Sequence, residues 1–225
     1  MDWSVVSLTL KLACTVTAVL LLIATPIAWW LSQTSSKWKG VVSTICTMPM
    51  VLPPTVLGFY LLVLMGPNGP LDAVFNSMGI PRLPFSFIGI VIACTVHSLP
   101  FVVQPLENSF KAIGKGPLEA AATLRCPPLN VFFEVAVPLA WPGILSAAIM
   151  GFCHTLGEFG VVLMVGGNIP GQTRVLSVAI YSHVEAMEYG QAHLLAGGLV
   201  LISMLALLMI HAIQSYGSQL REERA

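Results

Sequence analysis

The sequence predicts an all-α integral membrane protein with five transmembrane helices, and three observations carry this prediction. Of the 225 residues, 56% are hydrophobic and only 9% are charged, whereas soluble domains carry about 25% charged residues. Five stretches contain no Asp, Glu, Lys or Arg, and each is longer than the roughly 20 residues that cross a bilayer as a helix. The basic residues also gather in alternate connections between these stretches, as in membrane proteins of fixed orientation.

We expect one membrane domain over residues 1–225, with helices at about 5–31, 41–65, 85–105, 137–165 and 192–213. The first apolar stretch is not interpreted as a signal peptide. Asp2 precedes it and Lys11 lies inside it, and at about 27 residues it exceeds the 7–15 residues of a signal-peptide core. It is therefore expected to remain as the first helix.

The basic residues predict the orientation of the chain. Lys and Arg stay preferentially on the cytoplasmic side of a membrane, and seven of the ten fall on one side of the expected topology. These seven are Lys37, Lys39, Lys111, Lys115, Arg125, Arg221 and Arg224. The N-terminus is thus expected outside and the C-terminus inside the cell, and all five Trp residues fall near expected helix ends, where aromatic belts form.

The second helix is expected to be irregular, because Pro49, Pro53 and Pro54 lie within it. Each proline lacks an N–H and collides with the preceding turn, so the helix must kink or break. The freed carbonyls find partners only against protein or a water-lined cavity. Two interpretations stay open: a pathway-lining helix with a hinge, or a static kink that helps packing. Pro53, Pro54 and Thr55 are accordingly candidates for the pathway or gate.

Glu158 is the one acid deep in an expected span. An intramembrane carboxylate is costly and by default marks a functional position. His154 lies one helical turn earlier, so the two side chains share a face and could hydrogen-bond. We favour a structural or gating role, in which Glu158 pairs with His154 or caps a glycine-loosened turn, over a proton relay, which needs several members. His97, in the third helix, is interpreted as a polar group satisfied at a helix contact.

The longest cytoplasmic connection, residues 106–136, is expected to hold a short helix. Pro117 suits the first helical position, and Glu119 follows in the first turn, where the helix dipole favours an acid. Three alanines come next, and alanine is the strongest helix former. Pro127 and Pro128 are expected to stop the helix. The Ala-rich face favours docking against a partner over an ordinary loop helix.

Four strings occur in order along nearly the whole chain and resemble one family. They are Met48 to Gly58, Glu119-Ala120-Ala121 with Val137-Pro138 downstream, Leu156 to Gly160, and Gly167 to Arg174. The set resembles the oxyanion branch of ATP-binding cassette (ABC) importer permeases, and most closely the molybdate permeases. Tungstate and sulfate permeases share the Glu-Phe-Gly string more loosely. The resemblance implies the type I importer permease fold.

The resemblance also implies partners and roles for particular residues. Two copies of the chain would form the membrane core, bind two ATPase subunits inside and receive a periplasmic oxyanion-binding protein outside. Alternating access would then move molybdate inward. The residues at the ATPase-coupling positions would be Glu119, Ala120, Ala121, Leu124 and Arg125. Asn168 and Arg174 would lie in an outer loop that faces the binding protein.

One position departs from the family pattern. The family motif has Gly three residues after Glu-Ala-Ala, and here that residue is Arg125. Gly there ends the docking helix in a left-handed conformation, which Arg adopts at a cost of about 1–2 kcal/mol. Pro127 and Pro128 are therefore the expected helix stop.

Several classes of site are not expected in this chain. It has no phosphate-binding loop, no His-Glu-x-x-His and no Gly-x-Ser-x-Gly, so we expect no catalytic residue and no ATPase activity of its own. Its five cysteines are scattered without metal-ligand spacing. No metal or cofactor is expected on this chain, and ATP and Mg would bind the partner ATPase. A passive channel or an intramembrane enzyme is the alternative from another class.

Overall fold

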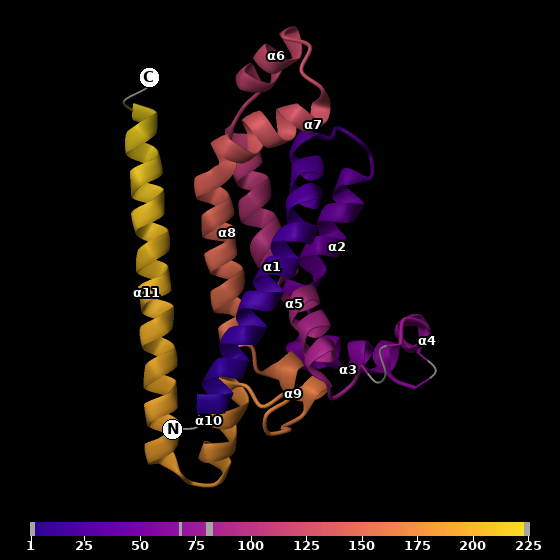
Figure 1. Cartoon of the computed structure of the whole chain (residues 1–225), viewed down its shortest axis with the longest axis vertical. Helices are drawn as coiled ribbons and strands as arrows, with labels where there is room; N and C mark the ends of the chain where they lie inside the picture. The colour runs from indigo at the N-terminus through magenta and orange to yellow at the C-terminus, as the bar shows by residue number, and fades with distance from the viewer. Residues whose placement is uncertain (1–2, 68, 80–82, 223–225) are drawn as a thin grey trace.

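The computed structural model describes residues 3–67, 69–79 and 83–222, and every regular element within these ranges is helical (Figure 1). The all-α prediction is therefore confirmed. Among the described residues, four helices are long and apolar enough to cross a membrane, and a bent pair of helices makes a fifth crossing if it is counted as one span. The four are Trp3–Gln33, Phe87–Ala112, Pro128–Gly157 and Tyr189–Ala212, and the bent pair is Lys39–Val51 with Pro54–Met65.

Three long helices form the centre of the bundle: α1 (Trp3–Gln33), α5 (Phe87–Ala112) and α8 (Val137–Gly157). Their shared core includes Leu20, Val102 and Phe110, all fully buried. Small residues allow the close approach that helices in membranes need. At Gly151 of α8, for example, an added Cβ would lie 2.7 Å from Cγ2 of Val102 on α5.

The second expected span is broken in two at Pro53 and Pro54, as predicted, whereas Pro49 lies inside the first of the two helices and does not end it. Helix α2 (Lys39–Val51) packs against α5 and ends where Leu52 and Pro53 adopt extended backbone, with ψ of 138° and 135°. Helix α3 (Pro54–Met65) then leaves at 112° to α2. Because Pro53 and Pro54 have no N–H to donate, the helical ladder cannot continue through them. The short helix α4 (Pro70–Ser77) follows α3.

The fourth expected span, residues 137–165, is also broken, although it contains no proline at the break. Helix α8 ends at Gly157, Glu158 is extended with ψ of 123°, and α9 (Gly160–Gly166) begins two residues later. The two breaks meet in space, since a Cβ on Gly160 would lie 2.8 Å from Cβ of Pro54. From that point α3 packs along α9, with Gly58 against Met164.

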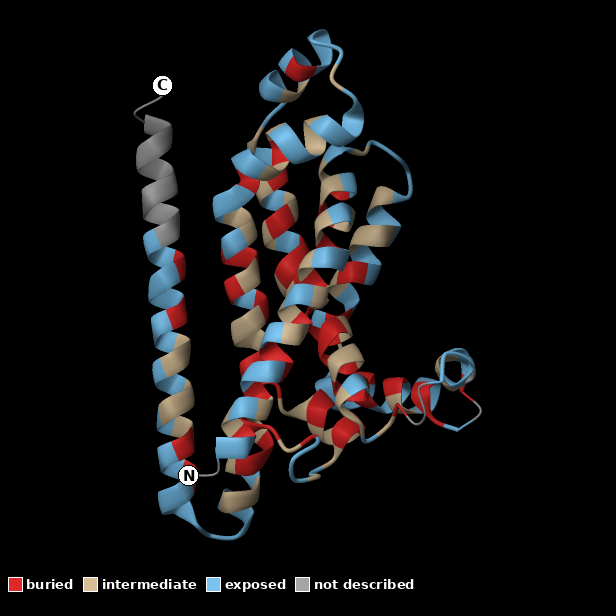
Figure 2. Cartoon of the chain, in the orientation of Figure 1, coloured by how far each residue is buried: buried red, intermediate tan, exposed pale blue. Residues whose placement is uncertain are grey.

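The last two helices form a hairpin beside the bundle. Helix α10 (Leu176–Glu185) lies at the end where α1 begins, and α11 (Tyr189–Glu222) runs back beside the bundle toward the end where α6 (Gly116–Thr123) lies (Figure 1). Its main contacts are with α10 and α8. Much of its side is exposed (Figure 2), and the exposed residues include Leu201, Leu205 and Leu208. Such a surface suits contact with lipid chains.

The connection between α5 and α8 lies at the opposite end from α10 (Figure 1). It contains α6 (Gly116–Thr123), the single turn α7 (Pro128–Asn130) and η1, a π-helical stretch at Val131–Ala136 that continues directly into α8. Helix α6 stands clear of the bundle and contacts its own chain mainly through η1.

Candidate functional site

The expected coupling segment folds as a short exposed helix. In α6, Pro117 lies in the first turn with Glu119, as predicted. Glu119 and Ala120 are exposed, whereas Ala121 faces inward and is buried. Leu124 follows with 81% of its surface exposed. An exposed helix with an acidic residue, small residues and an exposed Leu offers a surface on which another protein can bind.

The end of α6 differs from the expectation. Arg125 takes the left-handed conformation with φ of +56°. Its N–H donates to the carbonyl of Ala122 at 3.0 Å, and the N–H of Cys126 donates to the carbonyl of Ala121 at 3.2 Å. These two bonds define a Schellman helix end with Arg in the position that Gly usually takes. The expectation that Pro127 and Pro128 stop the helix is therefore wrong, because the helix has already ended at Arg125.

Glu158 caps the helix that follows it. Its Oε1 accepts the N–H of Val161 at 3.0 Å, which satisfies one of the free donors at the start of α9. The predicted cap is thus confirmed. In addition, Ser177 of α10 donates from Oγ to the backbone carbonyl of Glu158 at 2.6 Å. The break between α8 and α9 is therefore stabilised by two hydrogen bonds, one to the side chain of Glu158 and one to its backbone carbonyl.

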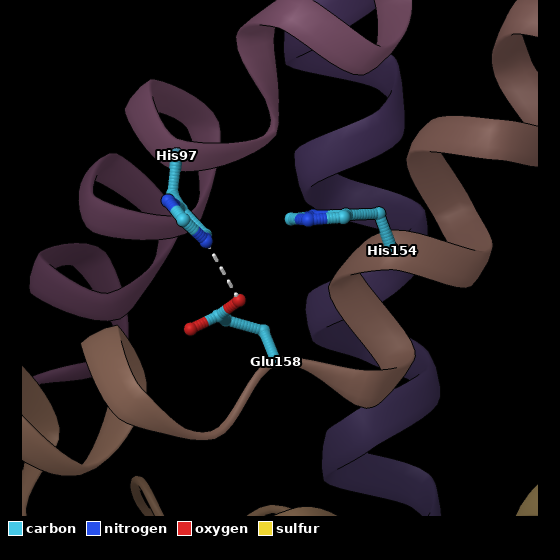
Figure 3. Close-up of side chains that lie close together, drawn as sticks. All are labelled: His97, His154 and Glu158. Atoms are coloured by element: carbon cyan, nitrogen blue, oxygen red, sulfur yellow. Dashed lines mark ion pairs between the residues drawn. The ribbon is translucent and has the colours of Figure 1, made fainter. Parts of the chain in front are cut away.

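The ion-pair partner of Glu158 is His97 of α5, not His154. Oε2 of Glu158 lies 3.1 Å from Nε2 of His97, and both side chains are buried (Figure 3). The predicted pairing with His154 is wrong, because the chain leaves the helix at Glu158 and loses the one-turn relation. His154 instead places Nδ1 2.9 Å from Oγ of Ser98. Its ring stacks on Phe101, with centroids 3.8 Å apart.

His97 is the member of this cluster that the sequence did not indicate. It was expected at a helix contact as a satisfied polar group, yet its Nδ1 is buried without a hydrogen-bond partner among the described residues. One ligand atom from each of His97, His154 and Glu158 lies within 4.8 Å of the others. The signal in the sequence was weak, because His97 and Glu158 lie 61 residues apart and are joined only by the fold.

The other pathway candidates lie at the meeting point of the two breaks. Pro54 contacts Gly160, two residues after Glu158. Pro53, Pro54 and Thr55 are all exposed. The structure therefore brings Pro54 close to Glu158 and leaves all three candidates on the surface of the chain.

The outer loop that contains Asn168 and Arg174 is ordered by its own side chains. Oδ1 of Asn168 accepts from Nε of Arg174 at 2.6 Å, and Nδ2 of Asn168 donates to Oγ of Ser182 at 2.9 Å. Beneath them, the buried Thr173 donates from Oγ1 to the carbonyl of Gly166 at 2.7 Å. In the neighbouring α10, a hydrogen bond to Glu185 and its negative charge raise the pKa of Tyr181 above its usual value. The two expected contact residues thus share one preformed surface.

Comparison with known proteins gives concordant results. Residues 21–217 match the family described as binding-protein-dependent transport system inner membrane component. The chain is 56% identical over 215 residues to the molybdenum transport system permease protein ModB of Azotobacter vinelandii, covering 96% of this chain and 95% of that one. It is 32% identical over 209 residues to ModB of Escherichia coli K12, covering 91% of each. Its fold matches a chain of the inward-facing MetNI methionine ABC transporter with a TM-score of 0.60 and 18% identity, covering 100% of this chain and 98% of that one.

Proposed function

This chain belongs to the family of binding-protein-dependent transport system inner membrane components, and from that premise we propose that it is the permease subunit of an ATP-driven molybdate importer. Molybdate is proposed as the substrate because the chain is 56% identical, over 96% of its length, to a molybdenum transport system permease. The chain is a multi-pass protein of the inner membrane, and a separate ATP-binding cassette subunit would supply ATP hydrolysis, with ATP and Mg bound there.

The partners are a second copy of this chain, two ATPase subunits and a periplasmic oxyanion-binding protein. The exposure of α6 supports an ATPase contact. Glu119, Ala120 and Leu124 are exposed, and the helix has few contacts with the rest of its own chain. The preformed surface of Asn168 and Arg174 supports a contact at the other end of the molecule. In this arrangement the N-terminus is periplasmic, and α6 lies in the cytoplasm with the C-terminal end of α11.

The coupling path follows one continuous element. Movement of α6 reaches η1, which it contacts, and η1 continues into α8 without interruption. The span Pro128–Gly157 has 30 residues and is about 45 Å long at 1.5 Å per residue. It therefore acts as a lever from the ATPase end to the break at Glu158, where α9 and α3 lie across the molecule. Rigid movement of such units is the usual basis of alternating access.

Uptake of labelled molybdate in cells with and without this chain tests the substrate, with tungstate and sulfate as competitors at trace molybdate. We expect loss of high-affinity uptake in the deletion, and competition in the complete cells by tungstate but hardly by sulfate. Equal uptake with and without the chain would contradict a molybdate importer. Strong competition by sulfate would move the proposal to a sulfate permease.

The coupling role is tested by Glu119→Lys, which reverses the charge on the exposed face of α6. We expect ATP-dependent uptake to be abolished while the protein still reaches the membrane in normal amounts. Asp72→Lys reverses a charge in α4, at the other end of the molecule, and is the matched control that should retain uptake. Uptake that persists in Glu119→Lys, or in cells without an ATPase partner, would contradict a coupled permease.

A further inference from the structure

The break between α8 and α9 gathers three metal-ligating side chains from separate segments. His97 comes from the middle of α5, His154 from the last turn of α8, and Glu158 from the extended residue that follows (Figure 3). One ligand atom of each lies within 4.8 Å of the other two. His97 and Glu158 are buried and His154 is half-buried.

The ring of His154 is held by a hydrogen bond at Nδ1. Oγ of Ser98 lies 2.9 Å from this nitrogen. Ser98 also lies 3.4 Å from Oγ1 of Thr155, which itself donates to the carbonyl of Gly151 at 2.8 Å.

The carboxylate of Glu158 contacts His97 and a backbone N–H, and within the described part of the chain it pairs with no Lys or Arg. Oε1 accepts from Val161 and Oε2 from Nε2 of His97. Nδ1 of His97 is buried without a hydrogen-bond partner among the described residues. The cluster thus offers a carboxylate and two imidazole rings to a cation.

We propose that His97, His154 and Glu158 form a binding site for a divalent transition-metal ion of the Zn²⁺ class. Two imidazole nitrogens and a carboxylate oxygen are a donor set that such ions prefer. Two of the three ligands already have the outer partners that fix a metal ligand, Ser98 on His154 and the N–H of Val161 on Glu158.

A divalent ion would gain three ligand bonds in this cluster. With the ion on Nε2 of His97, the ring proton of His97 lies on Nδ1. Metal–ligand distances of about 2.0–2.2 Å require the three side chains to draw together by small rotations.

The bound ion would tie α5 to the end of α8 and to the start of α9. These are the elements on either side of the break, and α3 packs on α9. A shared ion would hold this region in one arrangement, so micromolar Zn²⁺ is expected to inhibit uptake in cells that carry the unaltered chain. The site concerns regulation of the permease and does not depend on which oxyanion it carries.

Co²⁺ binding to the purified permease–ATPase complex tests the site. Co²⁺ gives visible ligand-field absorption when it occupies a Zn²⁺ site. We expect one Co²⁺ per permease chain, displaced by Zn²⁺, and a loss of affinity of at least about tenfold in His154→Gln, since changes around a metal site typically cost 10–100-fold. His154→Gln is chosen because the residue is half-buried and Gln can still hydrogen-bond Ser98. His97→Gln is the second variant and is expected to behave in the same way.

The matched control is His183→Gln. His183 and Glu188 form a second His–carboxylate pair at 2.7 Å on the surface of the molecule, so its removal should leave Co²⁺ binding unchanged. The proposal is overturned if the unaltered complex binds no Co²⁺, or if His154→Gln and His97→Gln, eluting as intact complexes, bind it as well as the control does. Binding is measured without molybdate, so that result would leave the proposed function standing.

Discussion

Two apolar spans of this protein are interrupted, and different chemistry makes each interruption. Between α2 and α3 the two adjacent prolines interrupt the helix, because both Pro53 and Pro54 lack an N–H and collide with the preceding turn. Between α8 and α9 there is no proline, and the break is held by the side chain of Glu158, which caps α9 and pairs with His97. The first break is a fixed property of a few adjacent residues. The second depends on a distant partner and can be altered by changing that partner.

The two breaks also support one another. Pro54 lies against Gly160, so the start of α3 is positioned by the start of α9. We therefore expect a substitution at one break to alter the packing at the other. Four substitutions separate the contributions, and each can be followed by thermal unfolding of the purified permease–ATPase complex.

The largest effect is expected from Glu158→Ala. It removes the cap of α9 and leaves His97 buried without its partner. Losing one member of a buried pair destabilises a protein by about 3–5 kcal/mol, which corresponds to a fall in Tm of roughly 10 °C for a chain of this size. A loss under about 1 kcal/mol would mean that the second break is also fixed by the backbone. Ser177→Ala, which removes only the bond to the carbonyl of Glu158, should cost less.

Gly160→Ala tests the contact between the breaks. The new Cβ would lie 2.8 Å from Cβ of Pro54, and that ring cannot rotate away. Overpacking of this kind costs about 1–3 kcal/mol. Gly157→Ala is the matched control three residues earlier, where an added Cβ meets nothing within 4 Å. Equal stability of the two variants would show that contact between the two breaks does not contribute to stability.

Arg125→Gly extends the comparison to a third helix end, that of α6. Arg125 holds φ of +56°, a conformation that glycine adopts without strain, so the variant should be more stable by about 1 kcal/mol. Leu124→Gly is the control, because Leu124 has φ of −80° and gains nothing from glycine. Destabilisation by Arg125→Gly would indicate that the Arg side chain makes a contact worth more than the strain.

The smallest effect is expected from Pro53→Ala. Pro54 still prevents the helix from continuing, and φ of −55° at Pro53 is open to alanine. The loss should be about 0.5 kcal/mol, mainly from the greater freedom of the unfolded chain. A loss comparable to that of Glu158→Ala would contradict the view that the first break is redundantly fixed by two prolines.

The sequence predicted what local chemistry decides. The charge-free stretches predicted the spans, the prolines predicted the first break, and the position of Pro117 and Glu119 predicted the start of α6. The helix end at Arg125 was mispredicted, because a left-handed Arg is unfavourable locally and the hydrogen bonds to Ala121 and Ala122 appear only in the folded chain.

The cluster at Glu158 could be predicted only in part. The cost of a carboxylate in a membrane marked the residue, and its capping role followed from the glycines around it. Its partner did not, because the one-turn spacing to His154 assumes a helix that Glu158 itself interrupts. The approach of His97 depends on the packing of α5 against α8, which no local pattern in the sequence encodes.

Helix α11 lies outside the central bundle of α1, α5 and α8, and this has a consequence for the order in which the helices assemble. Helices α1, α5 and α8 bury their core against one another, and all three precede α11 in the chain. The central bundle can therefore complete its packing in the bilayer before α11 has been synthesised. The helix then adds to a finished surface, with Ala206 and Ile210 against Ile149. Docking of α11 can thus follow assembly of the central bundle, and lipid can solvate the helix until it docks.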